Sequence, residues 1–402
     1  MKIDVAGVVP RDVLSPRTAD ELADAVRALH AERKTFAFAG GATHLDLGNA
    51  PRPLDALIRM SALNGVIEYA PEDQTITVEA GMTLGALDRI LAQHGQMLPL
   101  DAYDRDRATV GGVVAANVYG RRRQRYGTAK DLIVGVGIVR ADGVRARGGG
   151  KVVKNVAGFD LPKLMAGSLG TLGAIVHVTF RLYPMPDATR AAVLHLDREA
   201  PIVGATDAIA ERRLEPESVV LYDYHALVVT FSGTTAGVDE QMRALLGELA
   251  PRFTAGAAEL TDLEREAYEQ RERAVRRDGP WRLHVVTPPA ESAATAASGA
   301  PAPPITVPVA YPMLGVSFHA FGDAAFAGDA AAPDSHVRDL RDTVAAATNG
   351  HGRVVFDAMP NAARPLVDAW GPPPASFALM RRMKANFDPH ALCNPGRFVG
   401  GL

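Results

Sequence analysis

The sequence predicts an α+β protein with two domains. Its 402 residues exceed the length of one typical domain, and a composition of 47% hydrophobic and 22% charged residues is ordinary for a globular chain with sizeable cores. Patterns typical of strands and helices alternate from residue 15 to residue 184. The character of the sequence changes after Pro184-Met185-Pro186. We therefore expect a first domain over 1–186 and a second domain beyond it.

The first domain begins with a turn, a helix and a strand. The helix is predicted from apolar residues that follow Thr18 at helical spacing, namely Leu22, Ala25, Val26 and Leu29. Residues 36–39 read as a short strand that runs into Gly40-Gly41. The later elements expected here are a strand over 75–78, a helix over 84–94 and strands over 132–139 and 174–182.

The second domain has a different pattern. Two strands are expected, over 219–224 and 226–231. Residues 260–277 form a predicted helix in which both signs of charge are mixed, most simply as a solvated face. Residues 288–308 are rich in Pro, Ala and Ser, which suits a loop or linker. A helix and then the turn Asn394-Pro395-Gly396-Arg397 are expected within 376–402.

Charge, hydropathy and cysteine content exclude several classes of protein. The formal net charge of -3 gives no field that would attract nucleic acid. No apolar run approaches the ~20 residues of a membrane helix, and Met1–Val5 lack the apolar stretch of a secretory signal. Cys393 is the sole cysteine, so neither a disulfide nor a four-thiolate iron-sulfur cluster can form within the chain. We expect a cytoplasmic protein without a transmembrane segment.

Two glycine-rich blocks are the most informative part of the sequence. Residues 108–120 combine the pair Gly111-Gly112 with small, apolar and amide residues, and residues 167–173 carry a glycine at every third position. A backbone without large side chains can lie against a flat, phosphate-bearing ligand. The open amides expected at Gly40-Gly41 favour a pyrophosphate in the same way. These blocks predict the wall of a cofactor site.

Several familiar motifs match only in part. Residues 135–140 begin like a dinucleotide fingerprint, but Arg140 replaces the third glycine and the segment reads as a strand. Gly150-Lys151 lacks the first glycine and the hydroxyl residue of a phosphate loop. Residues 166–170 lack the first glycine and the preceding strand of a nucleophile elbow, so Ser168 is interpreted as a turn residue.

Histidines and arginines give weaker signals. The eleven histidines never recur at three- to five-residue spacing, so we expect no locally encoded metal site. The densest basic run is Arg121-Arg122-Arg123-Gln124-Arg125. A solvated loop is the favoured interpretation of this run, and a role in holding an anionic substrate, cofactor or partner is the alternative.

Several ordered blocks resemble the flavoproteins of the vanillyl-alcohol oxidase type, whose FAD domain is also called the p-cresol methylhydroxylase (PCMH) fold. The blocks are Gly95–Pro99, Gly111-Gly112, 149–161, 164–173 and Phe387-Asp388-Pro389. Within that family the sequence is most similar to glycolate oxidase subunits of the GlcE type. The resemblance implies a PCMH-type FAD-binding domain of two subdomains over 1–186, an α+β cap or substrate domain over 187–375, and a C-terminal segment, 376–402, that returns to the FAD domain.

The resemblance also implies which residues bind the cofactor. They are Gly40, Gly41, Ala42, Thr43, His44, Thr109, Gly111, Gly112, Ala115, Asn117, Gly170, Gly173, Ile175, Asn394 and Gly396. The first five would form a pyrophosphate loop, and the last two would approach the flavin from the C-terminal segment. The alternative is a plain turn at Gly111-Gly112 and a capping turn at Asn394 and Gly396.

Non-covalent FAD is the expected cofactor. Relatives that bind flavin covalently through this loop carry a histidine where the chain has Thr43, with His44 one position later. Cys393 lies far in sequence from the segments that carry cysteinyl links in the family. His44 is therefore interpreted as a loop residue.

The resemblance implies an FAD-dependent oxidoreductase that acts on a small 2-hydroxy acid such as glycolate or lactate. Such chemistry needs a base, a cationic clamp for the carboxylate and a nearby flavin. Related catalytic subunits carry His-x-Gly-Asp-Gly-Asn-x-His in the cap domain, whereas the nearest segment here, 318–324, lacks the asparagine and the second histidine. His319 is the candidate base, although a lone histidine beside apolar residues is more often structural.

Three functions stay open from sequence. In the first, the chain is a dehydrogenase or oxidase subunit that passes electrons to an iron-sulfur subunit and works beside a second flavoprotein subunit, with any membrane association made through these partners. In the second, it is an FAD-binding assembly or electron-relay subunit without its own substrate site. In the third, it is a free-standing alditol or sugar oxidase, which is less favoured because such enzymes commonly carry the flavin-linking histidine.

Overall fold

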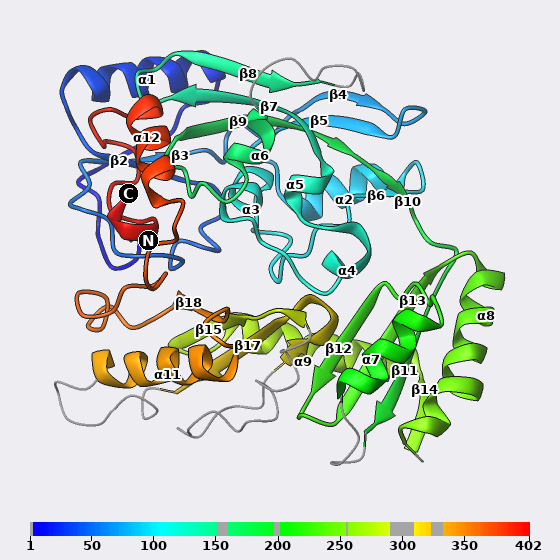
Figure 1. Ribbon diagram of the computed structural model, residues 1–402. Helices are drawn as coiled ribbons and strands as arrows, with labels where there is room; N and C mark the ends of the chain where they lie inside the picture. Colours follow the sequence, from blue (N-terminus) through cyan, green and yellow to red (C-terminus); the bar gives the residue numbers. More distant parts are fainter. Residues whose placement is uncertain (1–2, 151–159, 197–201, 255, 290–308, 323–332) are drawn as a thin grey trace. The chain divides into compact units, whose positions relative to one another are not determined.

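The computed structural model describes residues 3–150, 160–196, 202–254, 256–289, 309–322 and 333–402. Two compact units are formed (Figure 1). Unit 1 comprises residues 1–120, 127–185 and 372–402, and unit 2 comprises residues 121–126 and 186–371. The limits lie close to the expected Pro186 and 376, but 121–126 belong to unit 2. The loop expected over 288–308 lies outside the described residues from 290 onward.

The first subdomain of unit 1 is a three-stranded parallel sheet in the order β1-β3-β2. Its elements are β1 (Asp12–Leu14), α1 (Ala19–Ala31), β2 (Phe36–Ala39) and β3 (Ala56–Arg59). Thr18 caps α1 by accepting a hydrogen bond from the Glu21 amide at 3.1 Å. The predicted helix and the predicted strand over 36–39 are therefore confirmed, and their apolar faces share one core.

The second subdomain is a five-stranded antiparallel sheet in the order β4-β5-β9-β7-β8. Its strands are β4 (Val66–Ala70), β5 (Thr75–Glu79), β7 (Ile133–Arg140), β8 (Arg145–Gly149) and β9 (Gly173–Arg181). Its helices and a small two-stranded ladder are α2 (Leu84–Ala92), α3 (Val110–Ala116), α5 (Ala129–Leu132), α6 (Leu161–Met165), β6 (Gln96–Met97) and β10 (Tyr183–Pro184). The segment 135–140 is a strand as predicted, whereas α2 ends two residues before the predicted His94.

The C-terminal segment is part of unit 1. Helix α12 (Phe377–Phe387) is followed by a turn that brings Cys393 beside β2, where it forms a parallel bridge with Phe36. The Phe36 amide donates to the Leu392 carbonyl at 2.8 Å, and the Asn394 amide donates to the Phe36 carbonyl at 2.8 Å. Residues 392–394 therefore extend the first sheet beside β2, the strand that leads into Gly40.

Unit 2 is built on an eight-stranded antiparallel sheet in the order β14-β11-β13-β12-β16-β17-β15-β18. The strands are β11 (Ala188–His195), β12 (Ser218–Tyr222), β13 (Ala226–Gly233), β14 (Gly256–Leu260), β15 (Trp281–Val286), β16 (Val309–Tyr311), β17 (Val316–Phe321) and β18 (Arg353–Ala358). The helices are α4 (Arg123–Tyr126), α7 (Ile202–Glu211), α8 (Thr235–Ala244), α9 (Asp262–Arg277) and α11 (Pro333–Ala347).

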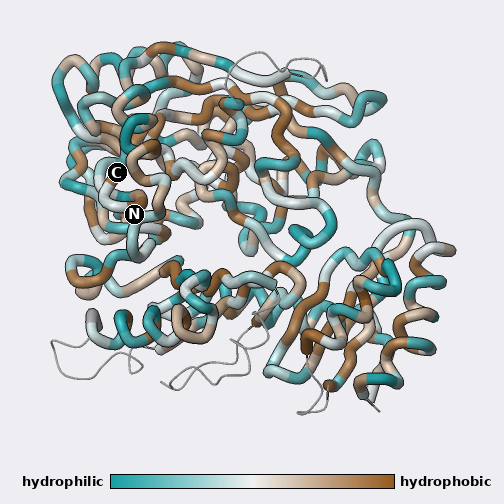
Figure 2. The backbone as a smooth tube through the Cα atoms, viewed as in Figure 1, coloured by the Kyte–Doolittle hydropathy of each residue, from teal (hydrophilic) through white to brown (hydrophobic). Residues whose placement is uncertain are grey.

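The two faces of this sheet have different coverings. One face packs against α7, α8 and α11 through apolar cores (Figure 1). Tyr222, Tyr311 and Phe318 alternate to the other face, where they contact α9. Figure 2 shows hydrophobic residues running along the strands of both units. Glu272 of α9 lies there with the guanidinium groups of Arg121 and Arg276, so we call this the charged face of unit 2.

Two interpretations from sequence are wrong on this charged face. Helix α9 does not present its charges only to solvent, because Glu272 is 4% exposed. The run that begins at Arg121 is not simply a solvated loop. Arg121 contacts Glu269 at 2.6 Å and Glu272 at 3.5 Å, and Arg122 contacts Glu217 at 3.4 Å. Acidic partners distant in sequence draw these arginines into unit 2.

Candidate cofactor-binding site

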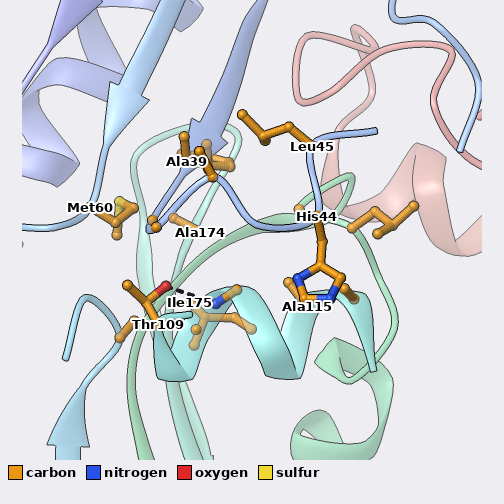
Figure 3. Close-up of a pocket in the computed structure, with 18 of the residues that line it drawn as sticks. Ala39, His44, Leu45, Met60, Thr109, Ala115, Ala174 and Ile175 are labelled. Atoms are coloured by element: carbon orange, nitrogen blue, oxygen red, sulfur yellow. Dashed lines mark hydrogen bonds between the residues drawn. The ribbon is translucent and has the colours of Figure 1, made fainter. Parts of the chain in front are cut away.

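A pocket in unit 1 brings together almost all of the predicted cofactor-binding residues (Figure 3). Its lining comes from the segment after β2, the start of α3, the turn before β9 and the C-terminal segment. Of the predicted residues, Asn117 and Gly396 do not line it. The others that line it are Gly40, Gly41, Ala42, Thr43, His44, Thr109, Gly111, Gly112, Ala115, Gly170, Gly173, Ile175 and Asn394.

The loop after β2 lies directly against the segment that precedes α3. A Cβ atom on Gly40 would overlap the Thr109 hydroxyl, and one on Gly41 would overlap the Arg107 carbonyl. Glycine is therefore required at both positions by packing within the protein. Glycine at these positions was expected from the close approach of a ligand, and packing against the segment before α3 is a second reason for it.

Helix α3 forms the floor of the pocket in Figure 3. Thr109 caps it, and its hydroxyl accepts a hydrogen bond from the Gly112 amide at 3.4 Å. A Cβ on Gly111 would lie 2.6 Å from the Ala80 Cβ. The plain turn considered for Gly111-Gly112 is wrong, because both belong to the first helical turn. Asn117 ends the helix in the left-handed conformation.

The turn before β9 supplies the third wall. Gly170 and Gly173 have φ angles of 69° and 144°, which favour glycine. A Cβ on Gly170 would lie 2.5 Å from the Asn394 side-chain nitrogen, so the turn and the C-terminal segment approach closely. Ile175 is buried at the start of β9.

Asn394 contributes a buried amide to the pocket. It is 1% exposed, and its Nδ2 donates to the Leu169 carbonyl at 2.8 Å. Among the described residues its Oδ1 has no hydrogen-bond partner. A buried acceptor without a partner is costly unless a ligand donates to it. The capping alternative fits Gly396, which has a φ of 90° and forms a turn near Arg52.

Arg397 is a pocket residue that sequence reasoning missed. Its guanidinium donates to the carbonyls of Leu45, at 2.7 Å, and of Leu47. It is 3% exposed, so a positive charge is buried beside the loop after β2. The feature that could have indicated this role is its position directly after Asn394-Pro395-Gly396, a segment expected only to form a turn.

His44 and Cys393 bear on covalent flavin attachment. His44 lines the pocket, with its Nδ1 2.9 Å from the Thr43 hydroxyl and its ring 5.0 Å from the Tyr103 ring. Cys393 is fully buried, and this burial raises the pKa of its thiol well above the ordinary value. A thiol kept protonated in this way is a poor nucleophile. Non-covalent attachment stays a prediction.

A dinucleotide fits these residues. The lining is dominated by Gly, Ala and Thr, which leaves backbone amides accessible to phosphate oxygens. The unpartnered Asn394 Oδ1 can accept from an N–H or O–H group, and Arg397 supplies positive charge. Loop, helix, turn and C-terminal segment would together hold the cofactor.

The charged face of unit 2 holds a histidine–aspartate pair that the sequence did not indicate. His284 on β15 places its Nδ1 2.9 Å from the Asp357 carboxylate on β18. Arg276 of α9 lies 4.7 Å from the centre of the Phe318 ring, and the His284 ring lies 5.9 Å from the same ring. Strand pairing, which spacing along the chain does not reveal, creates this arrangement.

His319 faces the opposite side of the sheet. Its register partner is Leu283, which packs in the core with α11. Its Nε2 lies 2.8 Å from the Ser317 hydroxyl, and burial lowers its pKa to about 4. These contacts are those of a structural histidine, and the catalytic role of His319 stays a prediction.

Two further observations apply to the described part of the chain. No group of three or more His, Cys, Asp or Glu side chains there is arranged to hold a metal ion. No helix in the described ranges combines the length and the apolar character needed to cross a membrane.

Residues 10–148 match the family model of the FAD binding domain, and residues 372–398 match that of the FAD linked oxidases, C-terminal domain. Both matches fall in unit 1 apart from residues 121–126, and they include the pocket segments other than 169–175. The chain therefore contains an FAD-binding domain and a segment similar to the C-terminal domain of the FAD-linked oxidases. The resemblance, the PCMH-type FAD-binding fold and the FAD cofactor that it implied are confirmed.

Individual relatives match about half of the chain. Glycolate oxidase subunit GlcE of Escherichia coli K12 is 36% identical over 47% of this chain and 54% of its own length. Glycolate oxidase subunit GlcD of Bacillus subtilis is 28% identical over 59% of this chain and 51% of its own length. D-2-hydroxyglutarate dehydrogenase of Xanthomonas citri is 31% identical over 46% of this chain and 40% of its own length. The matched region thus spans about half the length of these curated relatives.

A solved structure of alkyldihydroxyacetonephosphate synthase has the same fold. It superposes with a TM-score of 0.68 at 16% identity and covers 95% of this chain and 75% of its own. This likeness concerns the fold alone, and it extends over both units.

Proposed function

We propose that the chain is an FAD-dependent oxidoreductase that oxidises a small 2-hydroxy acid such as glycolate or lactate, as a subunit of a complex. The observation that carries the proposal is the unit 1 pocket, whose lining residues fall largely within the segments matched to FAD-linked proteins. The names of the relatives point to glycolate and 2-hydroxyglutarate as the chemical class of substrate. The fold alone would not distinguish among substrates.

When bound, FAD supplies the acceptor for two electrons from the carbon that bears the hydroxyl group. The chain must supply a base for the hydroxyl proton. We propose His284 for this role, because the Asp357 carboxylate fixes the orientation of its ring through Nδ1. The substrate then becomes a 2-oxo acid.

A carboxylate substrate also needs positive charge. Arg276 lies on the same face as His284, and both side chains contact the Phe318 ring. The Arg276 guanidinium lies 3.6 Å from the Glu272 carboxylate, which Arg121 also contacts. Two guanidinium groups therefore adjoin one carboxylate. We propose Arg276 as the group that attracts the substrate carboxylate.

An FAD-binding assembly or electron-relay subunit is the second candidate. It is favoured by the relative named as subunit GlcE, and by the departure of the segment after His319 from the motif of the catalytic subunits. In this case a related flavoprotein subunit would perform the oxidation, and an iron-sulfur subunit would receive the electrons in either case.

The test uses the purified chain with its flavin. The visible spectrum is recorded before and after acid precipitation, and flavin in the supernatant is the expected result for non-covalent FAD. Anaerobic glycolate or D-lactate is then added, and bleaching of the flavin bands is expected. Full flavin occupancy without bleaching by any 2-hydroxy acid would favour the relay subunit. Peroxide production with polyols would favour a free-standing oxidase instead.

A further inference from the structure

A buried ion pair lies directly behind the pocket. Lys384 in α12 places its Nζ 2.7 Å from the Asp388 Oδ2, with side chains 8% and 0% exposed. Burial of two charges seldom stabilises a fold more than apolar packing would, so such a pair calls for another explanation. Both residues belong to unit 1.

Every donor of the ammonium group has a defined partner. Besides Asp388, Nζ donates to the Thr171 carbonyl at 2.7 Å and to the Cys393 carbonyl at 3.0 Å. An ammonium group has three N–H donors, so each of them has an acceptor here. The Asp388 carboxylate in turn accepts from the amides of Leu392, at 3.0 Å, and Cys393, at 2.8 Å.

These partners come from the two segments that meet at the pocket. Thr171 follows Gly170 in the turn before β9, and Cys393 precedes Asn394. Lys384 therefore ties together two backbone segments that lie more than 200 residues apart in sequence. The pair fixes the distance between these two walls.

Asn394, which follows Cys393 directly, is held in place on both its backbone and its side chain. Its backbone is held by the Phe36 carbonyl and its Nδ2 by the Leu169 carbonyl, each at 2.8 Å. Because Nδ2 donates to a carbonyl, the amide orientation is assigned and Oδ1 is the remaining group. A side chain on Gly170 would overlap the Asn394 amide, so the glycine makes room for the amide beside the turn.

We propose that Lys384 and Asp388 are positioning residues for the cofactor, and that they hold Asn394 so that its Oδ1 accepts a hydrogen bond from an N–H or O–H group of FAD. The inference rests on FAD binding within the proposed function and is independent of the substrate. The pair acts through Asn394 and does not itself line the pocket.

The test measures the FAD dissociation constant of the flavin-free chain by quenching of flavin fluorescence. Asn394→Leu keeps the size but removes both the Oδ1 acceptor and the Nδ2 donation to Leu169, at a residue with a left-handed φ of 43°, so FAD binding is expected to weaken by at least about tenfold. Lys384→Met is expected to weaken binding in the same direction. Lys34→Met, which removes an exposed pair with Glu32, is the control and is expected to leave binding unchanged.

A double-mutant cycle separates positioning from general stability. If Lys384 acts through Asn394, then Lys384→Met in the Asn394→Leu background adds little further loss of FAD affinity. Should Lys384→Met fail to fold, the charge-neutral pair Lys384→Met with Asp388→Asn replaces it in the same cycle. Fully additive losses, or a variant that unfolds more easily yet binds FAD as tightly as the unaltered chain, would overturn the inference. Failure of the unaltered chain to bind FAD at all would instead overturn the proposed function.

Discussion

The pocket of unit 1 and the charged face of unit 2 are built from opposite kinds of residue. The pocket is lined mainly by backbone and small side chains, with Arg397 as a buried cation at one end. The charged face depends on long side chains such as Arg121, Glu272 and Arg276, which reach one another from different segments. A backbone site tolerates little added volume, whereas a charge network tolerates little unbalanced charge.

The comparison also separates two roles for buried charge. In unit 1 the Lys384–Asp388 pair satisfies backbone carbonyls and amides, so it shapes the main chain. In unit 2 the carboxylates of Glu269 and Glu272 pair mainly with guanidinium groups, so the charges stabilise one another. Changes in unit 1 should therefore affect ligand geometry, and changes in unit 2 should affect stability and substrate chemistry.

The largest expected effect tests the proposed chemistry of the charged face. His284→Ala should lower the rate of flavin reduction by a 2-hydroxy acid about 10²- to 10⁴-fold, because the hydroxyl proton loses its base. Rapid-mixing absorption under anaerobic conditions measures this rate. His319→Asn is the matched control on the opposite face, and a larger loss in that variant would restore His319 as the base.

The next effect tests how tightly the pocket backbone is packed. Gly41→Ala places a Cβ against the Arg107 carbonyl, and we expect unfolding to become easier by about 3 kcal/mol or a displaced loop with weaker FAD binding. Urea denaturation measures the change. Gly247→Ala, at an exposed position with no described atom within 4 Å of the added Cβ, should be neutral or slightly stabilising. Equal behaviour of the two variants would contradict the comparison.

A third change tests the charge balance of unit 2. Glu272→Gln removes the charge of the buried carboxylate that Arg121 and Arg276 both contact, so the free energy of unfolding should fall by about 3 kcal/mol. Glu248→Gln removes an exposed pair with Arg212 and should leave the free energy of unfolding nearly unchanged. Denaturation curves of both variants decide the matter, and a stable Glu272→Gln protein would show that solvent compensates the charges.

The smallest effect is a pH dependence of stability. Burial lowers the pKa of His319 from 6.5 to about 4, so between these values the unfolded chain binds a proton that the folded chain does not. The free energy of unfolding should therefore fall as pH drops from 6.5 toward 4, with this residue contributing at most about 1.4 kcal/mol per pH unit. His319→Asn should reduce the slope. An unchanged slope would mean that His319 titrates normally in the folded protein.

Much of unit 1 could be predicted because its signals are local. Helical spacing after Thr18 predicted α1, alternation over 75–78 predicted β5, and 174–182, a strong strand candidate in sequence, forms β9. The glycines that line the pocket stood out in sequence because, at most of these positions, a left-handed φ angle or a close contact within the protein requires glycine. The resemblance then joined the segments into one site, which local patterns alone do not do.

The sequence by itself determined the elements of the FAD-binding unit and the glycine positions of its pocket, because backbone conformation and volume at one residue depend little on distant partners. Tertiary structure alone decided which charges are buried. Arg121 looked solvated until Glu269 and Glu272 were placed beside it, and Lys384 gave no signal until Thr171 and Cys393 were brought to its ammonium group. A charge is stabilised by its neighbours in space, and sequence order does not state which neighbours those are.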